Sequence, residues 1–230
     1  DPYFTVDGIS RGFNAFFRRS NFAEQNIAGY SSDAKGLGVN FGFPIGETQR
    51  IQVGLNVEHT DISEGLYTSL EISDFLFREG NEFLNYKLQG GWQYSTLNRG
   101  LFPTAGRSQT LKFVIAGPGS DVSSYKVSYD GEMYFPFRQD WSLRLWTELG
   151  FGGVYGDTET FPFYENFYAG GFGSVRGFQA STLGPRATLA PSDTYYGRFD
   201  SVGGNLLVQA GTEIIFPLPF VEDQYQVRPV

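Results

Sequence analysis

The sequence contains no cysteine and only one histidine, His59, among its 230 residues. The absence of cysteine excludes disulfide bonds and thiolate chemistry. Transition-metal sites are usually built from several cysteine and histidine ligands, and this chain cannot supply them. We therefore expect no metal and no cofactor.

Charged residues are also scarce, at 18% of the chain, where about a quarter is usual for soluble domains. The net charge is -8 and there is no basic tract, which argues against nucleic-acid binding. No uninterrupted apolar run reaches about 20 residues, so no transmembrane helix is expected. No signal peptide opens the chain, which begins as if it were part of a longer protein.

Aromatic residues and glycine are abundant instead, with 23 Phe, 14 Tyr and 30 Gly. Four segments alternate between apolar and polar residues with a period of two, at 50–60, 83–95, 125–135 and 141–151. Such alternation is typical of strands with two different faces. Weaker alternation occurs near 10–20, 36–45, 108–116 and 205–216. The pattern predicts about eight strands of roughly ten residues, a length that crosses a bilayer at a tilt.

The connections between these segments differ in length. Short turns are expected at 44–49, 98–107 and 136–140, whereas 21–35, 61–82 and 157–204 are longer and 117–124 is short. Outer-membrane barrels have short periplasmic turns and long extracellular loops, and aromatic residues gather at their strand ends, as they do here. We therefore predict an all-β, antiparallel transmembrane β-barrel, with a soluble β-sandwich as the alternative.

The titratable residues do not indicate an enzyme. His59 lies in phase with the apolar face of its strand, whereas a catalytic histidine needs an orienting acid and a nucleophile in a protected site. Glu148 and Glu213 point to the polar face, where we expect them to line a lumen and pair with Arg or Lys. The glycines between 170 and 177 lack the spacing of a phosphate-binding loop. A membrane-embedded hydrolase is thus disfavoured.

The connection 157–204 is the longest, and its composition does not indicate disorder. We expect it to fold into the barrel lumen, with its aromatic residues buried as a plug. Arg176 would then form a latch with a carboxylate of the inner wall, and its removal would leave that carboxylate unpaired. Seven aromatic residues make up the expected plug: Phe161, Phe163, Tyr164, Phe167, Tyr168, Phe172 and Phe178.

Four residues of this loop, Val175, Arg176, Gly177 and Phe178, resemble the V-R-G-F/Y motif of the outer-membrane insertase and two-partner-secretion superfamily. Other segments resemble the barrel-assembly branch of this superfamily in the same order, so the similarity covers essentially the whole chain. These segments are 1–8, 42–45, 99–104, 162–171, 174–179, 182–185 and 202–205.

The resemblance implies a function that needs no cofactor, the folding and insertion of β-barrel proteins into the bacterial outer membrane. Its partners would be unfolded outer-membrane proteins, accessory lipoproteins and the lipid bilayer. A polypeptide transport pore of the two-partner-secretion type is the alternative, and a surface receptor or adhesin is less favoured.

The resemblance also implies which residues act. The four motif residues would form the functional loop motif, and Glu213 matches the acidic partner of Arg176. A second partner, an Asp on the next strand, would lie beyond Val230. Residues 1–230 would be about eight strands of a barrel of about sixteen, with the periplasmic domains and the first and last strands outside them.

Overall fold

The computed structural model describes residues 4–21, 29–65, 68–138, 141–188 and 201–216. Within these residues, eight antiparallel strands form one sheet, in which each strand pairs with the next along the chain. This confirms the predicted strands, although several begin earlier or end later than the alternation indicated. The strands are β1 (Ser10–Asn21), β2 (Tyr30–Pro44), β3 (Gln49–Glu64), β4 (Glu82–Ser95), β5 (Gly106–Ala116), β6 (Ser124–Arg138), β7 (Trp141–Val154) and β8 (Leu206–Ile215).

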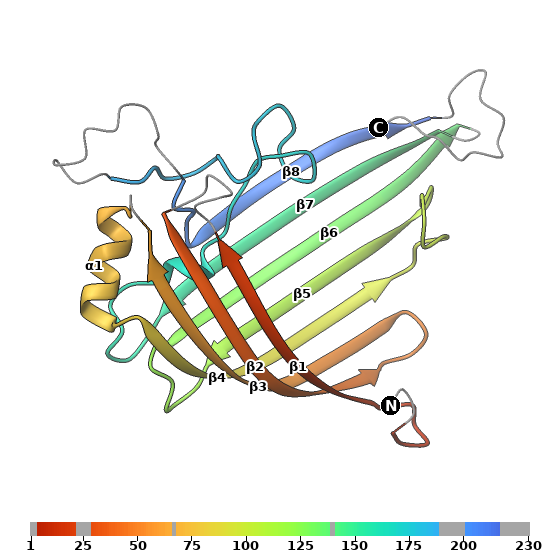
Figure 1. Ribbon diagram of the computed structural model, residues 1–230. Coiled ribbons are helices and arrows are strands. Elements are labelled where there is room, and N and C mark those ends of the chain that lie inside the picture. Colours follow the sequence, from red (N-terminus) through yellow and green to blue (C-terminus); the bar gives the residue numbers. More distant parts are fainter. Residues whose placement is uncertain (1–3, 22–28, 66–67, 139–140, 189–200, 217–230) are drawn as a thin grey trace.

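The sheet has a polar face and an apolar face. On β8, Leu206, Val208 and Ile214 are exposed on one side, whereas Leu207 and Gln209 are buried on the other. The sheet is strongly curved, and β1–β3 cross the direction of β6–β8 (Figure 1). No helix among the described residues is long and apolar enough to span a membrane.

The two longest connections lie at one end of the sheet, as the sequence predicted. Residues 45–48, 96–105 and 139–140 connect strands at the opposite end, whereas 65–81 and 155–205 lie at this end together with two shorter connections, 22–29 and 117–123. Aromatic side chains meet at the short-turn end, where Trp92 stacks on Tyr94 with ring centroids 6.2 Å apart and Trp141 stacks on Phe216 at 5.0 Å. Rings at this level are typical of a membrane interface.

A helix that the sequence analysis missed, α1 (Leu70–Glu79), lies between β3 and β4. The Ser69 side chain accepts a hydrogen bond from the Ile72 N–H, which caps the first turn, and Gly80 ends the helix at a φ of 92°. Ile72, Phe75 and Leu76 are buried, a spacing that places them on one helical face. The alternation with a period of two predicts only a connection at 61–82, because the helical period of α1 does not produce that pattern.

Among the described residues, a cluster of buried apolar side chains lies at the long-loop end, under α1. The helix packs on the ends of β2, β3 and β4 and on η1 (Phe163–Glu165), a single 3-10 turn in the connection between β7 and β8. Figure 1 shows α1 beside the ends of β3 and β4. The core consists of Tyr30, Ile62, Ile72, Phe75, Leu76, Phe83, Val122 and Phe163. The beginning of the longest loop is thus part of the hydrophobic core.

Candidate functional site

The long loop between β7 and β8 contacts the polar face of the sheet at two groups of charged residues. The first, which we call the tip anchor, consists of Arg176 of the loop with Glu213, Arg144 and Glu132 of the strands. The second, the base anchor, consists of Glu165 of the loop with Lys87, Lys126 and Glu58 of the strands. Each anchor joins residues that are far apart in the sequence.

The tip anchor is a chain of alternating charges. Arg176 Nη2 lies 2.8 Å from Glu213 Oε1, and Arg144 Nη1 lies 2.9 Å from Glu213 Oε2. Arg144 also donates to Glu132 Oε2 at 3.1 Å. The Glu213 side chain is only 12% exposed, whereas that of Arg176 is 40% exposed. The structure thus brings together Arg176 and Glu213, the two residues that the sequence paired.

Glu213 also has a partner that the sequence analysis missed. Arg144 is its register neighbour on β7, so the two side chains face the same side of the sheet. The expectation that removing Arg176 would leave this carboxylate unpaired is therefore wrong. In the alternating segment 141–151, Arg144 falls among the polar positions, and this position could have indicated that it pairs with Glu213.

Around the tip anchor, the loop and strands β5–β8 line a polar cavity of about 490 Å³ that is open to solvent. Asp130 and Glu148 line it, and the Glu148 carboxylate accepts a hydrogen bond from Gln209. Ser174 of the loop donates to Gln209 Oε1 at 2.6 Å, which gives the tip a further contact with β8. In the described part of the chain, no group of three or more acidic or histidine side chains could hold a metal ion.

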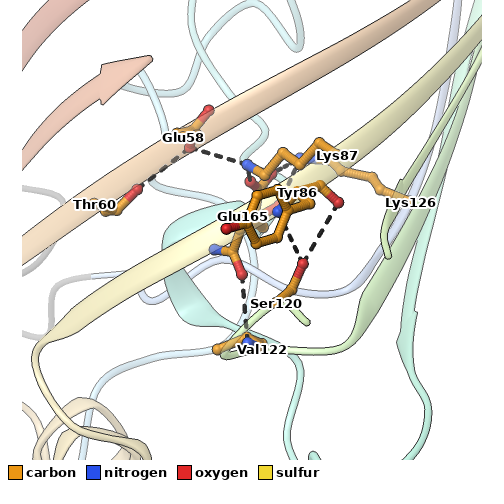
Figure 2. A network of polar contacts seen from close by, with 9 residues as sticks. Glu58, Thr60, Tyr86, Lys87, Ser120, Val122, Lys126 and Glu165 are labelled. Carbon is orange, nitrogen blue, oxygen red and sulfur yellow. Dashed lines mark hydrogen bonds and ion pairs between the residues drawn. The ribbon is translucent and has the colours of Figure 1, made fainter. Parts of the chain in front are cut away.

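The base anchor centres on Glu165 (Figure 2). Its Oε1 lies 2.8 Å from Lys87 Nζ, which also lies 2.9 Å from Glu58 Oε1. Lys126 Nζ donates to the Glu165 backbone carbonyl at 2.6 Å and lies 3.5 Å from its Oε2. Lys126 Nζ also lies 4.4 Å from the ring centroid of Phe167, close enough for a cation–π contact.

The base anchor keeps its loop carboxylate ionised. Burial alone would raise the pKa of Glu165, but the positive charges of Lys87 and Lys126 and their hydrogen bonds outweigh it and lower the pKa. Burial raises the pKa of the neighbouring Tyr164 phenol, which is therefore neutral. The Glu165 carboxylate is thus charged at neutral pH.

The loop aromatics divide into two groups, which corrects the expectation that all seven are buried. Phe163 is buried, and the rings of Phe161 and Phe167 lie against the glycines of β7. Phe172 and Phe178, near the tip, are 82% and 54% exposed. The tip is held by polar contacts. The Phe172 ring does not pack into the core, and its centroid lies 4.8 Å from the guanidinium carbon of Arg176.

The remaining motif residues surround this contact. Val175 is half-buried, and Gly177 has a φ of +89°, which favours glycine. Phe178 is exposed, as stated above. Arg176 is thus the member of the motif with a charged contact to the wall.

Two glycines of β7 provide the space for the loop rings. A Cβ atom on Gly152 would lie 2.3 Å from Phe161 Cζ, and one on Gly150 would lie 2.6 Å from Phe167 Cε1. We expect Gly152→Val to displace the Phe161 ring and destabilise loop docking by about 1–3 kcal/mol, the usual cost of overpacking. Hydrogen exchange of the Phe167 amide, which donates to the Gly204 carbonyl at 2.8 Å, measures the release.

Gly173→Ala is the matched control for this change. Gly173 lies in the same loop, and a Cβ there would have no neighbour within 4 Å. It should therefore leave exchange of the Phe167 amide within about twofold of the wild type. Equal exchange rates in the Gly152→Val and Gly173→Ala proteins would contradict the docking role of Gly152.

The full length of the chain, residues 1–230, matches the family model of the Omp85 superfamily domain. The chain belongs to the Omp85 superfamily. It is 33% identical, over 99% of its length, to the outer membrane protein assembly factor BamA of Neisseria meningitidis serogroup B. It is 26% identical, over 81% of its length, to the sorting and assembly machinery component 50 homolog of Mus musculus.

The structure agrees with this family assignment. It superimposes with a TM-score of 0.87 on the crystal structure of BamA from Haemophilus ducreyi lacking POTRA domains 1-3, at 31% identity over 98% of this chain. The chain spans 29% of the Neisseria protein, 37% of the mouse protein and 45% of the crystallised chain. The fold of this Omp85 chain is therefore that of the matching part of the BamA barrel, and its location is the outer membrane.

Proposed function

We propose that the complete protein folds β-barrel proteins and inserts them into the bacterial outer membrane, and that this chain supplies part of its barrel. The observation that carries the proposal is the 33% identity, along 99% of the chain, to a protein named as an outer membrane protein assembly factor. The mouse relative, a component of a sorting and assembly machinery, supports the same function. Both names favour assembly over the alternative, a polypeptide transport pore.

The physical basis of this activity requires no catalytic group. A strand entering a bilayer must satisfy its backbone hydrogen bonds, and a membrane-embedded sheet can provide partners and disturb the lipid packing around it. We therefore propose a protein without enzymatic activity or cofactor. Its clients would be unfolded outer-membrane proteins, and accessory lipoproteins would be its partners.

In this proposal the eight strands are part of a barrel of about sixteen, and the polar face lines its lumen. The long loop then lies inside the barrel as a brace, with Arg176 and Glu213 as the latch. The two anchors support this role because they join the loop to five strands: β3, β4 and β6 through the base anchor, and β6, β7 and β8 through the tip anchor. A loop attached in this way stiffens the wall against which a client would fold.

The test is a folding assay with the complete protein in lipid vesicles. An outer-membrane barrel protein unfolded in urea is added to the vesicles. Its folding is followed by gel electrophoresis of unheated samples, in which the folded and unfolded forms migrate differently. We expect folding at least tenfold faster than in vesicles that contain an unrelated closed barrel. Unchanged folding, together with passage of an unfolded secreted polypeptide into the vesicles, would replace the proposal with the transport pore.

A further inference from the structure

Arg107 is a cation on the apolar face of the sheet, at the short-turn end of β5. It precedes Gln109 and Leu111 on the same face, which are in register with Tyr94 and Trp92 of β4. The Arg107 side chain is exposed and takes part in no ion pair with the described residues. The strands on both sides of β4 and β5 belong to the described sheet, so this surface is complete without the rest of the barrel.

The strand register shows at which level of the membrane Arg107 lies. Toward the short turns, cross-strand rows on the apolar face change from apolar to polar, and Arg107 follows one row after the polar row. The apolar row is Ile51, Trp92 and Leu111, and the polar row is Gln49, Tyr94 and Gln109. Tryptophan and tyrosine at such a change mark the membrane interface, and the short turns of outer-membrane barrels face the periplasm. Arg107 therefore lies at the level of the lipid headgroups on the periplasmic side.

The Tyr94 side chain holds the guanidinium of Arg107 in place. Arg107 Nη2 donates to the Tyr94 hydroxyl oxygen at 3.1 Å, and Nε donates to the same oxygen at 3.3 Å. The guanidinium carbon lies 5.0 Å from the centroid of the Tyr94 ring, which itself stacks on Trp92. A guanidinium has five N–H donors and a phenol has one O–H, so both side chains keep donors for a further acceptor. The residues in register with Tyr94 and Arg107 supply no carboxylate, since they are Gln49, Gln109 and Met133.

We propose that Arg107 and Tyr94 bind the phosphate of an anionic phospholipid in the periplasmic leaflet. The remaining N–H groups of Arg107 donate to the phosphate oxygens, as guanidinium groups commonly do, and the Tyr94 hydroxyl donates to the same phosphate. An acyl chain lies over Gly90, which is in register with Val53 and Phe113 on the apolar face. A Cβ atom on Gly90 would have no neighbour within 4 Å, so there is open space between these two exposed side chains.

The charge arrangement favours a headgroup with a phosphate and no amine, such as that of phosphatidylglycerol. Such a lipid carries a net negative charge, which attracts the positive charge of Arg107. Ethanolamine and choline headgroups carry a positive charge of their own, so their net charge is zero and the attraction is weaker. They would also bring that positive charge to a position where no residue in register with Arg107 or Tyr94 is acidic.

The test measures which lipid the complete protein retains. The protein is equilibrated in detergent with equal amounts of phosphatidylglycerol, phosphatidylethanolamine and phosphatidylcholine with the same acyl chains, and bound lipids are counted by native mass spectrometry. We expect at least threefold enrichment of phosphatidylglycerol, which Arg107→Gln should abolish and Tyr94→Phe should reduce by at least half. Arg50→Gln is the matched control and should leave the enrichment unchanged. Arg50 is an exposed cation at the same end of the sheet, but it is in register with Pro44 and Gln93 on the polar face.

Several results would overturn the proposal. They are equal retention of the three lipids, preferential retention of either zwitterionic lipid, and enrichment that persists in Arg107→Gln or Tyr94→Phe. An equal loss of enrichment in Arg50→Gln would also overturn it, because the net charge of the protein would then be the cause. Tyr94→Phe removes only a hydroxyl group, so it gives the answer if Arg107→Gln fails to fold. Binding of glycerophosphoglycerol as tight as that of the intact lipid would show that the space over Gly90 is not used, which contradicts the proposal as well.

Discussion

Glu213→Gln is expected to release the tip of the long loop and to lower the stability of the folded protein by about 3 kcal/mol. The reason is that Glu213 is the only carboxylate in the tip anchor that pairs with both Arg176 and Arg144. Its side chain is largely buried, and removing one partner of a buried ion pair typically costs about 3–5 kcal/mol. We expect the lower end of this range because Arg144 keeps its contact with Glu132.

The same anchor predicts an order of effects. Arg176→Ala should cost only about 1 kcal/mol, since Arg176 is partly exposed and Glu213 keeps Arg144. The matched control is Asp130→Asn. Asp130 lines the same cavity but takes part in no ion pair among the described residues, so this change should leave the stability nearly unchanged. The measurement is urea unfolding of the complete protein in lipid vesicles, together with protease cleavage of the loop. If Glu213→Gln were no more destabilising than Asp130→Asn, the tip anchor would not hold the loop.

The strands could be predicted from the sequence because each has one face toward lipid and one toward polar groups. This environment imposes a period of two that is visible along the chain, for example in Leu84, Tyr86 and Leu88. The boundaries were less accurate. The predicted strand 36–45 begins earlier in the structure, at Tyr30. Residues near the loop end pack under α1 and the long loop, so their alternation no longer reflects one face toward lipid and one polar face.

The candidate site could be predicted only in part, because several of its contacts form only in the folded sheet. A family motif identified Arg176, and the polar phase of its strand identified Glu213. Glu165 carried no such signal, because its role depends on two lysines, 78 and 39 residues away in the sequence, that meet it only when the sheet curves. The space that Gly150 and Gly152 leave for aromatic rings is also a property of the folded loop and not of the local sequence.

Glu165→Gln is expected to release the base of the loop, again at a cost of about 3 kcal/mol. The change removes the charge that neutralises two lysines, of which Lys87 is nearly buried with a side chain that is 10% exposed. Lys87 keeps Glu58, but Lys126 keeps no carboxylate, only the backbone carbonyl of residue 165 and the Phe167 ring. Exchange of the Asn166 amide, which donates to Phe163, should rise about 100-fold, the factor that corresponds to roughly 3 kcal/mol.

Glu159→Gln is the matched control for Glu165→Gln. Glu159 is in the same loop and pairs with Arg78, but its side chain is 78% exposed, so its loss should cost less than about 1 kcal/mol. Equal exchange of the Asn166 amide in the two variants would mean that the base anchor contributes no more than a surface ion pair.

The base anchor should also respond to pH, with a direction that follows from the pKa of Glu165. Its pKa in the folded protein is lower than the ordinary value of 4.5, so the stabilisation is complete above that value and is lost as the pH falls through the folded pKa. The protection factor of the Asn166 amide in the wild type should therefore decrease below about pH 4.5. In Glu165→Gln it should already be low at pH 7 and change little with acid. If both proteins lost protection in parallel, another group would control the release, and the charge on Glu165 would not be what holds the loop to the sheet.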